Sequence, residues 1–477
     1  MILNTLISAL QAAGCILLVV LFFNFMIFVH ELGHFLAGKW RGAYIDRFQI
    51  WFGKPIWSKK IWGVQWGLGW IPAGGFVSLP QLESMEGIEG KADIPAEHLK
   101  PLKPLDKVII AAAGPLFSLL LAYAFAVVVW GVGKPVGEMQ GTTIGYVQPD
   151  SPAAQAGLLP GDTILTIDGK TVTKWMGNME GVRELIALSE HEQIELTISR
   201  PGVAAPLTIQ SSYTLPETKW WQRKAMRQLG VLPAMPAIVG HVLPGSPAEQ
   251  AGLKKWQKIT ALNGEPVYSP LVVQLASAEG KPLQLTLDNP KAQLSLTPAV
   301  PLNWQGKAGA QPILGVSWAD PADMLQLEHP SPQAQVNQSL KWMGNTLEKL
   351  FAPGSSVKME HLSGPVGIGS YIYKMMDAEN GAGWRLVLWF AVVLNVNLAV
   401  LNILPLPVVD GGHVTLGIIE MLRGKPVSGK PLEWIMTAFI FLLMAFFLFV
   451  TFKDVGDLVG GDKAPAEELP APLFVEP

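Results

Sequence analysis

The most prominent pattern along the chain is a series of four long apolar runs that contain no Asp, Glu, Lys or Arg. A helix of roughly 20 apolar residues spans the hydrocarbon core of a bilayer. The pattern therefore predicts four transmembrane helices, in segments 1–36, 107–133, 385–413 and 432–453. A secretory signal peptide is the alternative for the first run. However, no Lys or Arg precedes its apolar stretch, and ionisable residues stand where cleavage would occur.

Between these runs the chain is more polar. Residues 37–106 form a first polar region, residues 137–300 a long insert, residues 301–332 a Pro-, Gly- and Ala-rich linker, and residues 454–477 an acidic tail. Helical apolar spacing around Leu340 and Leu347 predicts amphipathic surface helices within residues 333–384, which could lie against the membrane.

The distribution of basic residues predicts the orientation of the spans. Lys and Arg follow the first run, precede the second and join the third to the fourth. By the positive-inside rule these loops are cytoplasmic. The N-terminus, the insert and the tail then face outward.

The insert contains an internal repeat. The twelve residues Val147–Leu158 return 95 positions later as Val242–Leu253, with nine identities. Each copy is followed by a short strand-like run and an Asp-Gly or Asn-Gly turn. The pattern resembles tandem PDZ domains, which bind an extended peptide as an added strand, and predicts such domains over 137–215 and 230–300. The second copy departs from the family pattern at Lys254–Gln257.

Composition agrees with a membrane protein and narrows its chemistry. Apolar residues make up 49% of the 477 positions and charged residues only 15%, with a net charge of −3. The basic residues form no block, so neither a nucleic-acid partner nor a polybasic surface anchor is indicated. Since Cys15 is the one cysteine, a metal must be held by His, Asp or Glu.

A metal-binding pattern stands at the inner end of the first run. The residues His30-Glu31-Leu32-Gly33-His34 have the H-E-x-x-H spacing. On a helix the two histidines lie about 40° apart, so both imidazoles can reach one tetrahedral zinc ion, with Glu31 in the same arc as a general base. Ionisable groups beside so long an uncharged stretch are costly in lipid unless bound or paired, which marks a functional site.

A catalytic zinc needs a third protein ligand. Asp410 follows the third apolar run with no basic partner nearby in sequence and is the natural candidate, while His413 is the rival. Pro405 and Pro407 remove two backbone donors and break the helix just before it. An unwound segment at membrane depth must line protein or a hydrated cavity.

These two motifs together resemble the paired signatures of the site-2 protease family of intramembrane zinc metallopeptidases. The resemblance implies that His30, His34 and Asp410 bind zinc and that Glu31 is catalytic. It also implies that four residues contact the substrate or shape the active site, namely Asn397, Asn402, Pro405 and Pro407.

Two further segments are similar to elements of this family. Residues 67–77 resemble its re-entrant β element, in which Gly74, Gly75 and Phe76 would hold the substrate extended. Residues 113–118 resemble a family motif that usually ends in Asn, whereas this chain has Ser118. No catalytic role is assigned to Ser118 on that basis.

The expected fold is a polytopic α-helical membrane protein with four transmembrane helices, a re-entrant β element and two periplasmic PDZ domains of the α+β class. The family resemblance implies a zinc endopeptidase that cleaves transmembrane segments of single-pass proteins after a first outer-side cut. Such substrates are anti-sigma factors of an envelope stress response and remnant signal peptides. The site would lie near the cytoplasmic side of a bacterial inner membrane.

Two other classes of protein are alternatives to the protease. A catalytically idle PDZ scaffold has no need for Glu31 between two ligands. A divalent-metal transporter would use intramembrane His and Asp as a transport site, but four spans and a large peptide-binding insert fit that class poorly.

Overall fold

The computed structural model describes residues 2–82, 94, 98–136, 139–177, 179–288, 291–319, 327–352, 355, 357–376, 383–425, 429–460 and 469–475. The chain divides into two compact units. The first comprises Met1–Pro135, Leu327–Asn345 and Ser363–Asp454, and the second Val136–Gln326, Thr346–Leu362 and Val455–Pro477. Each unit is described by itself.

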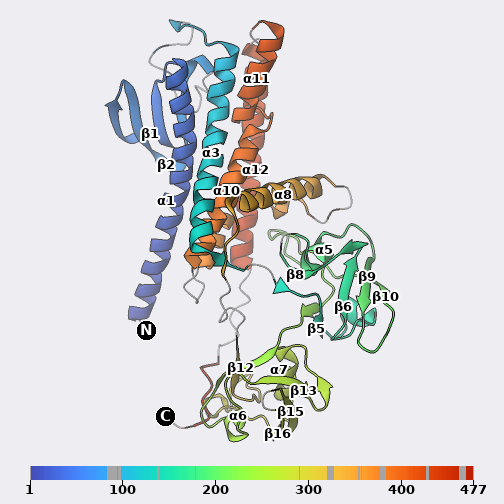
Figure 1. Cartoon of the computed structure of the whole chain (residues 1–477). Helices are drawn as coiled ribbons and strands as arrows, with labels where there is room; N and C mark the ends of the chain where they lie inside the picture. The colour runs from blue at the N-terminus through green and yellow to red at the C-terminus, as the bar shows by residue number, and fades with distance from the viewer. Residues whose placement is uncertain are drawn as a thin grey trace. The chain divides into compact units, whose positions relative to one another are not determined.

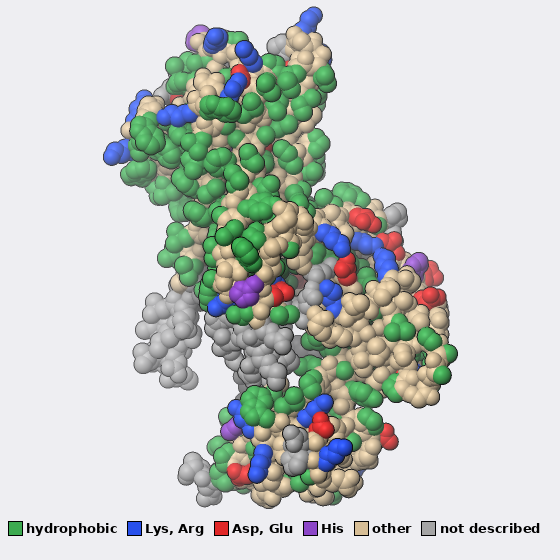
Figure 2. Space-filling view, viewed as in Figure 1, with side chains coloured by type: hydrophobic (Ala, Val, Ile, Leu, Met, Phe, Trp, Pro, Cys, Tyr) green, Lys and Arg blue, Asp and Glu red, His purple; other side chains and the backbone are tan. Residues whose placement is uncertain are grey.

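Long helices dominate the first unit (Figure 1). Within the described residues, four helices are long and apolar enough to cross a membrane. They are α1 (Ile2–Arg41), α3 (Pro104–Val132), α10 (Gly383–Ile403) and α12 (Gly429–Gly460). Hydrophobic side chains cover much of the visible face of this unit (Figure 2), and Phe441 on α12 is 71% exposed. An apolar surface of this kind suits lipid as its solvent, and it agrees with the four spans predicted from the sequence.

Helix α3 contacts α1, α10 and α11 (Asp410–Arg423). A methyl group at Gly33 of α1 would lie 2.5 Å from the Ala113 carbonyl oxygen, so the glycine permits the close approach of α1 to α3. On the other side of α3, Lys107 forms an ion pair with Glu420 of α11 at 3.0 Å.

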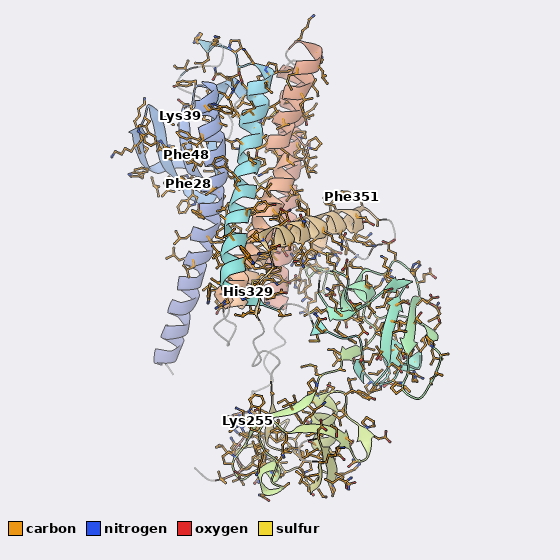
Figure 3. The ribbon with its side chains drawn as sticks, viewed as in Figure 1. Phe28, Lys39, Phe48, Lys255, His329 and Phe351 are labelled. Carbon is orange, nitrogen blue, oxygen red and sulfur yellow. The ribbon has the colours of Figure 1, made fainter. Side chains whose placement is uncertain are left out.

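A β-hairpin packs against α1. Strands β1 (Arg47–Ile61) and β2 (Val64–Ser78) pair antiparallel around the turn at Trp62 and Gly63. Phe48 is the centre of their contact with the helix, since its ring stacks on Trp66 at 4.3 Å and meets Phe28 of α1 edge-on at 5.6 Å (Figure 3). The predicted β element of residues 67–77 lies in β2, and its depth in a bilayer stays a prediction.

The chain leaves the helical conformation after α10. The predicted third span covers residues 385–413, whereas α10 ends at Ile403 and α11 starts separately at Asp410. Pro405 and Pro407 stand in the six-residue break, where they supply no backbone donor. The helix break expected from the two prolines is present, and it places Asp410 at the first position of a new helix.

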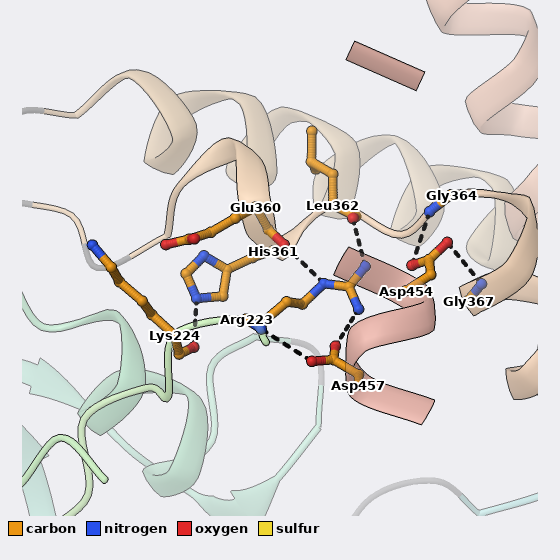
Figure 4. Close-up of polar contacts among 9 residues, drawn as sticks. All are labelled: Arg223, Lys224, Glu360, His361, Leu362, Gly364, Gly367, Asp454 and Asp457. Atoms are coloured by element: carbon orange, nitrogen blue, oxygen red, sulfur yellow. Dashed lines mark hydrogen bonds and ion pairs between the residues drawn. The ribbon is translucent and has the colours of Figure 1, made fainter. Parts of the chain in front are cut away.

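The predicted amphipathic segment 333–384 contains α8 (Pro332–Phe351), the short η5 (Met359–His361) and α9 (Pro365–Met376). In the first unit, the buried carboxylate of Asp454 on α12 accepts hydrogen bonds from the backbone amides of Gly364 and Gly367 (Figure 4). These amides lie at the start of α9, where helical N–H groups lack internal partners. Asp454 therefore attaches α9 to α12.

The second unit contains two modules built in the same order. Module 1 has β5 (Ile144–Val147), α4 (Pro152–Gln155), β6 (Thr163–Ile167), β7 (Lys170–Thr171), β8 (Lys174–Met176), α5 (Val182–Leu188), β9 (Ile194–Ser199), β10 (Leu207–Ser211) and β11 (Val231–Pro233). Module 2 has β12 (Ala237–Val242), α6 (Pro247–Gln250), β13 (Lys258–Leu262), β14 (Glu265–Pro266), α7 (Pro270–Ala278), β15 (Leu283–Leu287), β16 (Ala292–Leu296) and β17 (Val316–Trp318). Each module has its own apolar core.

The last strand of each module returns to pair with its first strand. Strand β11 pairs with β5, and β17 pairs with β12, in both cases antiparallel. The chain thus extends module 1 beyond the predicted boundary at residue 215, and it extends module 2 beyond residue 300 into the segment expected to be a linker. An identical tripeptide leads into each closing strand, Leu229-Gly230-Val231 and Leu314-Gly315-Val316.

Short elements complete the two units. In the first, β3 (Lys134–Pro135) pairs with β18 (Leu327–Glu328), so the two ends of the insert meet in one antiparallel pair. The remaining elements are η1 (Pro80–Leu82), β4 (Met139–Gln140), which pairs with β8, and η3 (Leu302–Trp304).

One arginine joins three segments of the second unit. Arg223, between β10 and β11, donates its backbone amide and a guanidinium N–H to Asp457, in the last turns of α12 (Figure 4). The same guanidinium donates to the carbonyl oxygens of Glu360 at 2.8 Å and Leu362 at 2.9 Å. A planar guanidinium suits such a site because its donors point in several fixed directions.

Candidate metal centre

Helix α1 presents His30 and His34 from successive turns. Both side chains are buried, and their Nε2 atoms lie 3.3 Å apart. This is the arrangement that an i, i+4 spacing produces, because such residues share one face of a helix. Two imidazole nitrogens therefore point at one place.

Asp410 reaches the same place from the first turn of α11. Its Oδ2 lies 3.1 Å from His30 Nε2, and its Oδ1 lies 3.2 Å from His34 Nε2. Among the described residues, no group donates a hydrogen bond to the buried Oδ2, although a buried carboxylate oxygen is costly to leave without a partner. The preceding Val408 has φ of 79°, a left-handed conformation that is strained for a β-branched residue.

The other ring nitrogens of the two histidines have partners on α3. His34 Nδ1 lies 2.8 Å from the Ile110 carbonyl oxygen and donates to it, because a carbonyl only accepts. Nε2 of His34 then carries the free lone pair. His30 Nδ1 lies 2.9 Å from Ser118 Oγ. A histidine that ligates a metal is commonly oriented in this way through its second nitrogen.

Gly114 on α3 lies directly against the two histidines. A methyl group there would come within 2.2 Å of His34 Nε2 and 2.8 Å of His30 Nε2, so only glycine leaves the converging nitrogens free. Gly114 enters the sequence analysis only as part of residues 113–118, and no catalytic role is assigned there to Ser118. The signal that could have found them was the resemblance of residues 113–118 to a family motif.

A cavity of about 380 Å³ opens over this cluster. Its lining combines the α1 and α11 residues with part of β2. Among the predicted site residues, the structure brings together in this lining His30, Glu31, His34, Asp410, Asn402, Gly74, Gly75 and Phe76. His413 lines it as well.

Three predicted site residues do not line the cavity. Asn397 is half-buried on α10, while Pro405 and Pro407 lie in the break between α10 and α11. Asn395, also on α10, is a fully buried asparagine to which the sequence analysis gave no role. Its amide nitrogen donates to the Ala391 carbonyl oxygen at 2.8 Å.

The donor set fits zinc. Ligand atoms about 2.0–2.2 Å from a tetrahedral ion lie about 3.3–3.5 Å from one another. Here the two Nε2 atoms lie 3.3 Å apart, and each lies 3.1–3.2 Å from a different oxygen of the Asp410 carboxylate. Within the described residues, His30, His34 and Asp410 form the one such group of possible metal ligands. His413 lies outside it. Two imidazoles and a carboxylate leave a fourth position for water or substrate, as catalytic zinc sites require.

Comparison with known proteins agrees with this chemistry. The model of Peptidase family M50 matches residues 18–446. A Neisseria meningitidis protein named as a zinc metalloprotease is 30% identical over 91% of this chain and 97% of its own length. Protease RseP of Yersinia pestis and the Regulator of sigma E protease of Haemophilus influenzae are each 28% identical, over 90% of this chain and 96% of their own lengths.

The family match includes His30, Glu31, His34 and Asp410 and ends before the C-terminal tail. The relatives are matched over nearly their full lengths. The four apolar helices agree with a multi-pass membrane protein. The chain therefore belongs to peptidase family M50 and is a zinc-dependent metalloprotease of the membrane.

Proposed function

We propose that this metalloprotease cuts its substrates within the membrane and that His30, His34 and Asp410 hold the zinc ion. The observation that carries the proposal is the convergence of two imidazole nitrogens, 3.3 Å apart, with the Asp410 carboxylate, whose two oxygens lie 3.1 and 3.2 Å from them, in a cavity that Glu31 also lines. The two histidines belong to a helix apolar enough to span a bilayer, and Asp410 follows another such helix after a six-residue break.

Glu31 acts as the general base. It lines the cavity from the same helix as the two histidines, where its carboxylate accepts a proton from the attacking water and returns it to the leaving amine. A zinc ion bound in such a site polarises the scissile carbonyl and lowers the pKa of water toward about 7. Ile110 and Ser118 orient the imidazoles, and Gly114 keeps the space before them open.

Strand β2 holds the substrate extended beside the ligands. Gly74, Gly75 and Phe76 line the cavity, and within the described residues β2 pairs only with β1. A sheet edge offers backbone partners to an unwound helix without reading its sequence. Asn402 adds a polar side chain from α10, while Asn397, Pro405 and Pro407 shape the break that leads to Asp410.

The two modules of the insert are PDZ domains that select substrates by size. Their repeated sequence and matching strand order support this assignment. The substrates are single-pass proteins already shortened on the outer side, of the anti-sigma factor type, together with remnant signal peptides. The relatives named as regulators of sigma E favour a role in an envelope stress response. The protein lies in a bacterial inner membrane, with its termini and modules in the periplasm.

Reconstitution tests the site of cleavage. The purified chain is placed in proteoliposomes with a single-pass reporter that carries a short outer segment, and the products are analysed by mass spectrometry. The proposal expects cuts inside the transmembrane segment that stop when zinc is chelated. Cuts confined to the soluble flanks would contradict it.

Zinc content distinguishes Asp410 from the rival ligand His413. Because removal of a ligand opens a three-residue site, Asp410→Ala should lose most of its zinc, whereas His413→Ala should retain it. Both are measured by elemental analysis of purified protein. Full zinc in Asp410→Ala together with loss in His413→Ala would transfer the assignment to His413.

A further inference from the structure

The C-terminal segment of the chain lies on module 2, beside α6, near the end marked C in Figure 1. Residues 470–475 read Pro-Ala-Pro-Leu-Phe-Val. Leu473 and Val475 are exposed and Phe474 is half-buried, and the chain bends at Ala471 and again at Phe474 and Val475.

Module 2 contacts the backbone of this segment with a set of specific hydrogen bonds. Asn303 donates its amide N–H to the Ala471 carbonyl oxygen at 2.7 Å and accepts from the Leu473 N–H at 3.0 Å. The Leu302 N–H donates to the Leu473 carbonyl oxygen at 2.8 Å, and the Trp304 indole donates to the Pro470 carbonyl oxygen at 2.6 Å. The three residues of η3 thus bind the C-terminal segment through its main chain.

Phe474 supplies the apolar anchor. It lines a cavity of about 560 Å³ together with Pro247 and Ala251 of the α6 region, Leu296 of β16 and Val300 after that strand. Two glycines with positive φ make room for it. A methyl group at Gly315 would meet the Phe474 ring at 3.0 Å, and one at Gly245 would lie 2.4 Å from Val475.

This surface differs from the place where a PDZ-like sheet would accept an added strand. The outer strands of the module 2 sheet are β16 and β17, and the tail forms its backbone hydrogen bond with Leu302 of η3 instead. The internal repeat supplies a comparison. Gly245 corresponds to Asp150 in module 1, where the backbone has a similar positive φ of 59° but carries a side chain.

We infer that the groove between α6 and η3 is a second peptide-binding site, whose ligand is a proline-containing apolar segment, and that residues 470–475 are its resident occupant.

Peptide binding tests the site without reference to proteolysis, so its failure would leave the proposed function untouched. A fluorescein-labelled peptide with the sequence of residues 469–477 is titrated, by fluorescence polarisation, into the purified intact chain and into a chain that ends at Gly460. A short tether gives the resident tail an effective concentration in the mM range. The shortened chain should therefore bind at least tenfold more tightly than the intact one, and a Phe474→Ala peptide should bind neither.

A substitution copied from module 1 locates the site. Gly245→Asp, made in the shortened chain, should reduce peptide binding at least tenfold, because a side chain there occupies the position of Val475. Gly252→Asp is the matched control, since Gly252 also has positive φ but a methyl group there meets nothing within 4 Å. Equal binding to intact and shortened chains, no binding to either, or unchanged binding after Gly245→Asp would overturn the inference.

Discussion

At the scale of single residues, the proposed metal centre requires the space that a glycine of α3 leaves open. Gly114 lies where any side chain would meet the two histidine nitrogens. Gly114→Ala should lower zinc content about tenfold or more, the size of effect expected when the support of a metal ligand is disturbed. Zinc is measured per purified chain by elemental analysis.

Gly131→Ala is the control for this substitution. Gly131 lies on the same helix, and a methyl group there meets nothing within 4 Å. Both variants replace a glycine of α3 by alanine, so a large difference in zinc content between them reports the contact with the histidines. Equal zinc content in the two variants would show that Gly114 has no part in the site.

Sequence reasoning reached some of these residues and missed others for a physical reason. The helical period alone brings His30 and His34 to one face, so their convergence follows from local geometry. The contacts of Gly114 and Ser118 with the same histidines depend on how α3 packs on α1, some 80 residues away in the chain. The sequence periodicity of α3 does not predict which of its residues will contact α1.

At the scale of elements, β2 forms one wall of the cavity. Gly74 has φ of 68°, and a methyl group there would lie 2.2 Å from the Phe52 ring, which stacks on Phe76 at 6.1 Å. Gly74→Ala should displace these rings into the cavity. A misplacement of about 1 Å costs on the order of 100-fold in rate, and the initial rate of reporter cleavage per bound zinc measures it.

Gly63→Ala serves as the control for β2. Gly63 has a similar φ of 81° in the turn of the same hairpin, but a methyl group there meets nothing within 4 Å. The variant carries the backbone cost of about 1–2 kcal/mol without the clash. If Gly63→Ala slowed cleavage as much as Gly74→Ala, the effect would belong to the stability of the hairpin and not to the cavity wall.

The elements also show where pattern reasoning falls short. Long apolar runs predicted the four helices, because length and composition suffice for that inference. The closing strands β11 and β17 are three residues each, and in the sequence they lie far from the repeat that predicts their modules. Their pairing with β5 and β12 is a tertiary contact. The sequence signal for it is the Leu-Gly-Val tripeptide that the two modules share.

At the scale of the whole molecule, the insert can be removed at a defined place. Pro135 of β3 lies opposite Leu327 of β18 in an antiparallel pair. Replacing residues 136–326 by Asn-Gly should therefore close a short hairpin and leave the first unit intact. A deletion of only 137–300 would leave β17 without its partner strand.

This deletion tests the proposed size filter. If the modules exclude substrates with large outer segments, the shortened protein should cleave full-length and shortened reporters at similar rates, while the intact protein prefers the shortened one. Zinc content shows whether the first unit survives the deletion. Unchanged preference for short substrates in a zinc-loaded deletion variant would reject the filter.

The central claim is that Glu31 moves the proton in a site whose metal is held by His30, His34 and Asp410. The most direct measurement compares the intact protein with Glu31→Gln, in which the side chain keeps its size but loses its basicity. Zinc content and cleavage of the transmembrane reporter are measured on the same samples. The account predicts full zinc with cleavage reduced by a factor of about 100 or more; a zinc-loaded Glu31→Gln protein that cleaves at the normal rate would contradict it.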